Sequence, residues 1–180
     1  MGKRKRVPVD PITDARNCQR CALATTRRSV VPFRLIGEAP ASILIIGLAP
    51  GRSEDMKGSA MVGPSGALLN RMLEKCGLDE SVLVTNAVMC RPCDERGGDN
   101  REPSPTEVLT CRRNVTALIQ RLSPCPRLVL FLGQVVDRYF RQEYPTAVSL
   151  LQPAYLLKTG GTGSPHYQGQ LRRLETLVRR

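Results

Sequence analysis

The chain has 180 residues, 41% of them hydrophobic, and a formal net charge of +11. That length and apolar content are enough for one compact domain with a sizeable core. No apolar stretch approaches the ~20 residues that a membrane span requires, and no apolar segment follows the basic start at residues 1–6. We therefore expect a soluble protein that is not secreted, cytoplasmic or otherwise intracellular, and associated with the nucleoid.

The basic residues indicate the kind of partner. Most of them are arginines, and they are spread along the whole chain. A guanidinium group binds phosphate with two hydrogen bonds, so the pattern favours a nucleic acid. The alternative is a basic surface without a dedicated partner. Residues 1–15 are predicted to be a basic N-terminal arm, phosphate-binding or simply frayed, and residues 16–180 a single domain.

The predicted elements of the first half begin with a buried strand over residues 43–46. A helix follows over residues 65–76, where apolar side chains recur at helical spacing, and Gly77 is its expected C-terminal cap. A second apolar run at residues 82–88 predicts another strand.

The second half opens with the clearest helix start in the chain. Ser104 offers a capping hydroxyl, Pro105 suits the first helical position, and Glu107 completes a capping box, so a helix is expected from there to about Leu122. A strand over 128–132, a helix after Gly133, a weaker strand over 147–151 and a terminal helix complete the pattern. This alternation predicts an α/β domain with a mostly parallel sheet and helices on both faces.

Two segments follow predicted strands directly. Gly47–Gly51 comes after the first strand and Asn86–Cys90 lies at the end of the second. Ligands of parallel sheets gather at the carboxyl ends of the strands. We therefore expect both segments to border a binding site.

Four cysteines are the candidate metal ligands. Cys18 and Cys21 form a CxxC pair, Cys90 follows a strand, and Cys111 lies within a predicted helix. All-thiolate ligation suits zinc or an iron–sulfur cluster, and the spacing alone does not choose between them. The alternative is buried structural cysteines without metal. The remaining cysteines are expected to be a competing ligand beside Cys90 and two core or surface thiols: Cys93, Cys76 and Cys125.

Several segments, in matching order and spacing, resemble one known family: Cys18–Leu23, Gly47–Asp55, Gly58–Gly66, Thr85–Pro92, Glu107–Cys111 and Pro153–Leu157. The family is the type 4, or iron–sulfur, uracil-DNA glycosylases, and the resemblance covers roughly residues 16 to 158. It implies a three-layer α/β/α sandwich and a [4Fe-4S] cluster on Cys18, Cys21, Cys90 and Cys111. It also implies DNA as the partner, single-stranded or as a mismatched duplex, because extruding a base costs least there.

The chain departs from the family at three functional positions. The family usually has glutamate, phenylalanine and histidine where this chain has Leu48, Met61 and Gln152. Only the amide expected to read the base, Asn86, is retained. A divergent member is therefore predicted, in which a thioether packs on the base and a glutamine N–H reaches the base O2.

The candidate site residues divide into two sets. The expected catalytic residues are Asn86, Gln152, Glu54 and Asp55, with a loop or salt-bridge role as the alternative for the two carboxylates. The expected substrate-binding residues are Gly47, Leu48, Ala49, Pro50, Gly51, Met61 and Asn86. The lone histidine, His166, is expected to be a surface residue rather than a catalytic one.

Two functions fit these residues. The first is a monofunctional DNA N-glycosylase, a hydrolase that flips uracil or another altered pyrimidine into a pocket and cleaves its N-glycosidic bond. The second is a catalytically silent DNA-binding module that keeps the fold, the cluster and the DNA surface. We favour the first, acting as a monomer. The sequence does not identify a protein partner.

Overall fold

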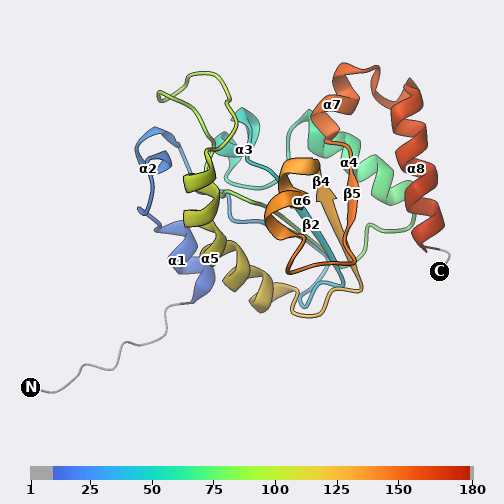
Figure 1. Cartoon of the computed structure of the whole chain (residues 1–180), viewed down its shortest axis with the longest axis horizontal. Helices are drawn as coiled ribbons and strands as arrows, with labels where there is room; N and C mark the ends of the chain where they lie inside the picture. Colours follow the sequence, from blue (N-terminus) through green and yellow to red (C-terminus); the bar gives the residue numbers. More distant parts are fainter. Residues whose placement is uncertain (1–9, 179–180) are drawn as a thin grey trace, which may run out of the picture.

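The computed structural model describes residues 10–178. A five-stranded sheet runs through the middle with helices packed on both sides (Figure 1). Its strands in chain order are β1 Arg34–Ile36, β2 Ile43–Gly47, β3 Val82–Asn86, β4 Leu128–Leu132 and β5 Val148–Leu150. The spatial order is β1-β3-β2-β4-β5, with β1 antiparallel to β3 and the other pairs parallel. The predicted mostly parallel α/β sheet is confirmed.

The helices are α1 Pro11–Arg16, α2 Leu23–Thr26, α3 Arg52–Lys57, α4 Pro64–Lys75, α5 Pro105–Leu122, α6 Gln134–Phe140, α7 Pro153–Lys158 and α8 Pro165–Val178, with a 3₁₀ turn at Gly161–Gly163. Side chains of α1, α5 and α6 share one buried cluster with the sheet. Side chains of α4, α7 and α8 share the cluster on the opposite face. The three-layer α/β/α sandwich is therefore confirmed.

The central strand β2 shows why the layers form. All of its residues are buried, as expected for a parallel strand covered on both faces. Because side chains alternate along a strand, Leu44 and Ile46 enter the α5 cluster. Ile43 and Ile45 enter the α4 cluster on the other side.

The local signals for α5 and α4 hold. The Ser104 hydroxyl accepts from the Glu107 N–H at 3.2 Å, and the Glu107 carboxylate accepts from the Ser104 N–H at 2.8 Å, which is the predicted capping box. Helix α4 ends at Lys75, and Gly77 follows with a φ of 62°. That left-handed conformation favours glycine.

Some boundaries differ from those predicted. Strand β3 ends at Asn86 rather than at residue 88. The predicted arm over residues 1–15 overlaps α1, whose Ala15 is fully buried beside α5, so residues 10–15 belong to the domain. Residues 1–9 of that arm lie outside the described residues. Within the described part, no helix is both long and apolar enough to cross a bilayer.

Candidate functional site

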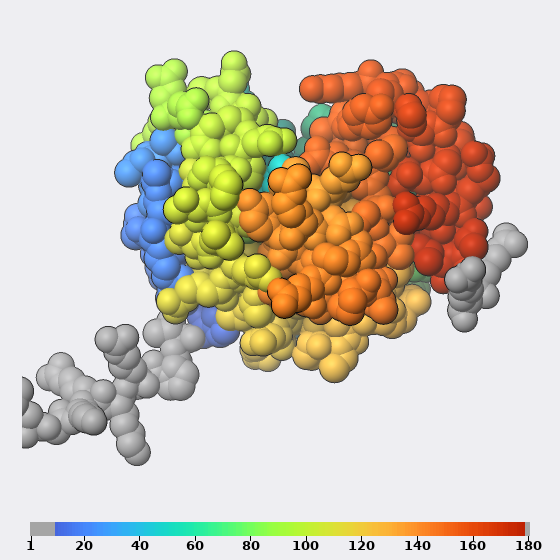
Figure 2. Space-filling view, in the orientation of Figure 1, coloured from blue at the N-terminus to red at the C-terminus, as the bar shows by residue number. Residues whose placement is uncertain are grey.

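A cavity of about 440 Å³ opens at the carboxyl ends of β2 and β4. This is where the strand order reverses, because the chain moves from β2 to β3 on one side and from β4 to β5 on the other. Ligands of open α/β sheets bind at such a switch point. Residues 47–51, 100–103 and 152–154 contribute to its walls, and we call it the base cavity. Figure 2 shows a notch between the yellow-green segment before α5 and the orange segment after β5.

Asn86 lies next to the floor of the base cavity. It is the last residue of β3, is 1% exposed, and its Oδ1 has no hydrogen-bond partner within residues 10–178. Gly47 pairs with it across β2 and β3. A Cβ on residue 47 would overlap Asn86 Oδ1 and would lie 3.0 Å from Met61 Cε. The structure thus brings these three predicted residues together, and glycine at 47 leaves room for the amide.

Met61 is held in an unusual backbone conformation. Its φ of 52° is uncommon for a residue with a side chain and carries a cost of about 1–3 kcal/mol. Arg34 Nη1 donates to the Met61 carbonyl at 3.1 Å from β1. On its other side, a Cβ on Gly66 of α4 would overlap the Met61 backbone. These contacts fix the backbone of Met61, whose side chain lines the base cavity.

Glu54 supports this loop instead of facing the cavity with free oxygens. Its carboxylate accepts from the N–H groups of Gly51, Val62 and Gly63 at 3.1, 3.0 and 2.8 Å. It is 9% exposed and closes the first turn of α3 onto the Met61 loop. A carboxylate with three backbone donors is a structural anchor, so this geometry favours the loop role over the catalytic role predicted for Glu54.

Asp55 faces away from the base cavity. Its Oδ1 accepts from the N–H groups of Arg28 and Ser29 at 3.0 Å each, and the carboxylate borders a separate arginine-lined cavity. Consecutive residues of α3 point in different directions, which separates Asp55 from Glu54. The structure therefore does not place Asp55 among the residues that line the base cavity.

Gln152 lines the base cavity from the segment between β5 and α7, where it is the N-cap residue of α7. Its side chain covers Gly133, where a Cβ would lie 2.7 Å from Gln152 Cγ and 3.1 Å from Nε2. Gly133 has a φ of 102°, which L side chains rarely adopt. His166 is exposed, and its ring lies tilted beside the Tyr155 ring with centroids 5.6 Å apart, so its predicted surface position is confirmed.

Several residues of the wall were not among the predicted site residues, namely Ser65, Asn100, Arg101, Glu102 and Lys158. Arg101 forms a bidentate ion pair with Glu107 at 2.8 and 2.9 Å and also contacts Asp94 at 2.8 Å. Hydrogen bonds to Glu107 and Asp94 raise the pKa of the Arg101 guanidinium. The hydrogen bond from Arg101 in turn lowers the pKa of the Glu107 carboxyl. The available signal was the charged segment at residues 94–102, between a strand and a strong helix cap.

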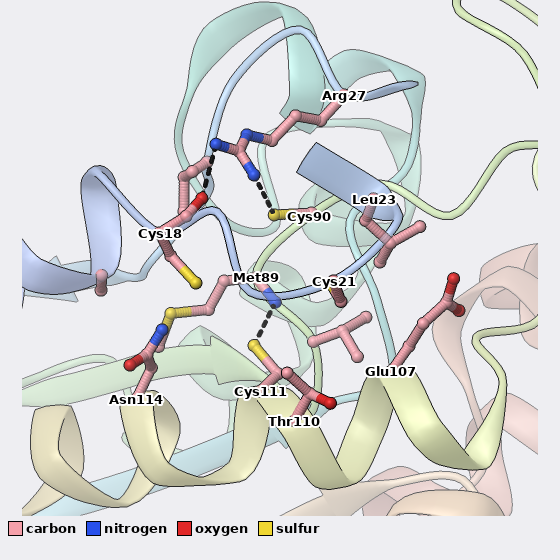
Figure 3. A pocket seen from close by; sticks show the side chains of 13 residues that line it. Cys18, Cys21, Leu23, Arg27, Met89, Cys90, Glu107, Thr110, Cys111 and Asn114 are labelled. Atoms are coloured by element: carbon pink, nitrogen blue, oxygen red, sulfur yellow. Dashed lines mark hydrogen bonds between the residues drawn. The ribbon is translucent and has the colours of Figure 1, made fainter. Parts of the chain in front are cut away.

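A separate cavity, which we call the cysteine cavity, is lined by all four predicted ligands, Cys18, Cys21, Cys90 and Cys111 (Figure 3). Arg27 Nη1 lies 3.7 Å from Cys90 Sγ. The Met89 N–H donates to Cys111 Sγ at 3.3 Å. Burial raises the pKa of Cys90 to about 11 and that of Cys111 to about 12.

The other three cysteines lie elsewhere. Cys93 is buried, and its thiol contacts carbonyl oxygens of Thr26 and Arg91. Cys76 is buried between α4 and α8, and Cys125 is exposed, as predicted. Across residues 10–178, no three or more Cys, His, Asp or Glu side chains stand close enough to hold a single metal ion.

The fold and site define a class: a doubly wound α/β/α domain with a buried amide beside a cavity at the strand switch point. The sequence pattern of the Uracil DNA glycosylase superfamily matches residues 35–175. The chain belongs to this superfamily and, within it, to the type-4 uracil-DNA glycosylases, as its curated relatives show.

Three of these relatives, each named a type-4 uracil-DNA glycosylase, show the extent of the match. The protein from Archaeoglobus fulgidus is 33% identical over 155 residues, which cover 84% of this chain and 74% of that one. The protein from Saccharolobus solfataricus is 39% identical over 134 residues, covering 73% and 58%. The protein from Thermotoga maritima is 32% identical over 126 residues, covering 69% and 61%. The chain thus spans between about three fifths and three quarters of these relatives' lengths.

Proposed function

We propose that this chain is a monofunctional DNA N-glycosylase that takes uracil or another altered pyrimidine into the base cavity and hydrolyses its N-glycosidic bond. The observation that carries the proposal is the Asn86 amide, which is buried beside the cavity with Oδ1 unpartnered in the described chain. A buried amide oxygen without a partner costs about 1–3 kcal/mol. A bound base edge would supply the missing hydrogen bond.

The residues around Asn86 suit a flipped pyrimidine. The Met61 thioether is apolar and polarisable, so it can pack on a flat ring. Its Cε and the Asn86 Oδ1 both lie within 3.0 Å of the place that a Cβ on residue 47 would occupy. Gln152, which carries an amide NH₂ group, also lines this cavity. Donors aimed at charge that grows on the leaving base lower the barrier to bond cleavage, and a neutral amide does this less well than a charged donor. We therefore expect a slow enzyme.

DNA is the proposed partner of this site. Arg101 and Lys158 both line the base cavity, and the whole chain carries +11. Phosphate contacts supply affinity that does not depend on sequence, while the cavity reads the base. The protein would act where the cell keeps its DNA, as a monomer on a single-stranded or mismatched target.

We also propose that the cysteine cavity holds a [4Fe-4S] cluster. Its donor set is four thiols from three separate segments, and an N–H donor from Met89 and a guanidinium from Arg27 lie beside two of the sulfurs. When bound, the cluster would tie the CxxC segment to β3 and α5. A brown protein with iron and sulfide supports this, and a colourless protein with stoichiometric zinc contradicts it.

One observation favours the silent DNA-binding module as a second candidate. Leu48 is apolar where the family usually carries a carboxylate, and Glu54 spends its oxygens on backbone N–H groups. The remaining carboxylate of the lining, Glu102, is exposed. The cavity therefore lacks a buried, unengaged carboxylate among the residues that line it.

The experiment compares the two candidates directly. Purified protein in excess is incubated with oligonucleotides that carry uracil or other altered pyrimidines, single-stranded and mismatched, and the products are treated with alkali to break abasic sites. We expect strand breakage at the altered base. DNA binding without breakage on any of these substrates would establish the silent module instead. Gln152→His should raise the single-turnover rate, and Gln152→Ala should lower it, if glycosidic cleavage uses this donor.

A further inference from the structure

A second polar cavity, of about 450 Å³, lies on the other side of α3 from the base cavity. Four arginines line it, together with Asp55, Met56 and Gly97, and we call it the arginine cavity: Arg28, Arg52, Arg91 and Arg96. Asp55 is the only acidic residue in this lining, and backbone N–H groups of residues 28 and 29 already engage its carboxylate. The lining therefore carries a clear excess of positive charge.

The arginine cavity combines one buried, hydrogen-bonded arginine with exposed arginines at its rim. Arg91 is 2% exposed, and its guanidinium donates to the Gly98 carbonyl and the Asn100 side chain, which anchors the loop before α5. Arg28 and Arg96 are exposed, and their guanidinium groups form no hydrogen bond or ion pair with any residue in 10–178. Two cations thus face solvent beside the buried Arg91, and the one carboxylate of the lining, Asp55, already accepts from two backbone N–H groups.

Arg52 completes the rim. It donates to the carbonyls of Gly97 and Gly98 at 3.1 and 3.2 Å, and its distance to Asp99 is 3.7 Å. The Asp99 side chain is fully exposed, so solvent screens this ion pair and a phosphate oxygen can replace the carboxylate. Guanidinium groups match the geometry of phosphate oxygens, to which they donate two parallel hydrogen bonds.

We propose that the arginine cavity binds a phosphodiester of the DNA backbone close to the nucleotide whose base enters the base cavity. Helix α3 divides the two cavities, because Gly51 and Glu54 border one while Arg52 and Met56 border the other. A helix with its side chains is about 10–12 Å across, which corresponds to roughly three base steps of a stacked strand. Met56, 63% exposed, offers an apolar surface to a deoxyribose at the same place.

This site would set the register of the DNA. Phosphate contacts carry no sequence information, but they position the duplex so that one nucleotide meets the base cavity. The inference rests on the proposed glycosylase function. The new element is a defined phosphate site outside the base cavity.

The test measures DNA affinity as a function of salt for Arg28→Ala and Arg96→Ala, by fluorescence anisotropy with a uracil-mismatch duplex. Each phosphate contact contributes about 0.9 to the slope of log K against log salt. Each variant should therefore lose about one unit of slope, and its affinity deficit should shrink roughly three- to four-fold between 50 and 200 mM salt. Excision at sub-saturating enzyme should fall together with the affinity, so the enzyme concentration needed for half-saturation should rise.

Arg121→Ala is the matched control. It removes the same charge from an exposed arginine near the far end of α5, roughly 20 Å along the helix axis from Glu107. Slopes for the two cavity variants equal to that of Arg121→Ala, with wild-type binding and excision intact, would overturn the phosphate site alone. Wild-type protein that neither binds nor excises would overturn the proposed function as well.

Inorganic phosphate distinguishes a DNA site from a site for free anion. Titration calorimetry with phosphate on wild type and Arg96→Ala measures whether the cavity binds the free anion. Millimolar or tighter phosphate binding that Arg96→Ala abolishes, combined with unchanged DNA salt slopes, would contradict the proposal. Loss of DNA slope together with weak or undetectable phosphate binding supports it.

Discussion

The role assigned to Glu54 gives the sharpest prediction about the architecture of the site. In Glu54→Gln, one carboxylate oxygen becomes an NH₂ group, so either the Gly51 N–H or the pair from Val62 and Gly63 loses its acceptor. Hydrogen bonds to a charged group contribute about 1.5–3 kcal/mol each, and the bonds that remain become neutral. We expect the free energy of unfolding to fall by about 2–4 kcal/mol.

Urea denaturation followed by circular dichroism measures this loss, with Glu80→Gln as the control. Glu80 is exposed, and surface substitutions of this kind usually stay within about 0.5 kcal/mol. Excision by Glu54→Gln should decline as well, because the Met61 loop loses its support. Wild-type stability combined with abolished excision would refute this reasoning and would restore Glu54 as a catalytic carboxylate.

Three further substitutions test other parts of the structure. Gly133→Ala should lower stability by about 1–3 kcal/mol and slow excision, because its Cβ collides with Gln152 at a φ that alanine avoids; unchanged melting and rate would contradict this. Glu107→Gln keeps the capping box but loses the ion pair, at a cost of about 1–3 kcal/mol. The Arg101 guanidinium lowers the pKa of the Glu107 carboxyl. The ion pair therefore stabilises the fold fully above the ordinary pKa of about 4.3, and this stabilisation is lost as pH falls through the lower pKa of the folded state. A difference in unfolding free energy between Glu107→Gln and wild type that does not narrow below about pH 4 would refute this. Cys111→Ser should reduce bound iron per chain, whereas Cys125→Ser, at the exposed cysteine, should not.

Much of the fold could be predicted because the signals were local. The capping box at Ser104 and Glu107 involves groups three residues apart, and the structure contains it as expected. The central parallel strands β2 and β4 are continuous apolar runs, which is the sequence pattern expected of strands covered on both faces. Strand β1 escaped prediction because it has only three residues, none fully buried, at the edge of the sheet.

The site was less predictable because its geometry depends on distant contacts. The position of Asn86 follows from its place at the end of a buried strand. The role of Glu54 depends on backbone N–H groups eight and nine residues further along the chain, which reach it only after the loop has folded back. Nothing in the local sequence indicates that Met61 adopts a positive φ. The arginine cavity, likewise, combines residues from three separate segments.

The central claim is that Asn86 recognises the base in the cavity at the switch point. The most direct measurement is single-turnover excision of uracil by wild type and Asn86→Ala, alongside DNA affinity by anisotropy. Removing the amide leaves the edge of the base without its hydrogen-bond acceptor, which costs about 1–3 kcal/mol, or roughly 5- to 150-fold in rate. We predict a loss of that size with DNA affinity within about twofold, because phosphate contacts supply most of the binding. Excision by Asn86→Ala at the wild-type rate would contradict it.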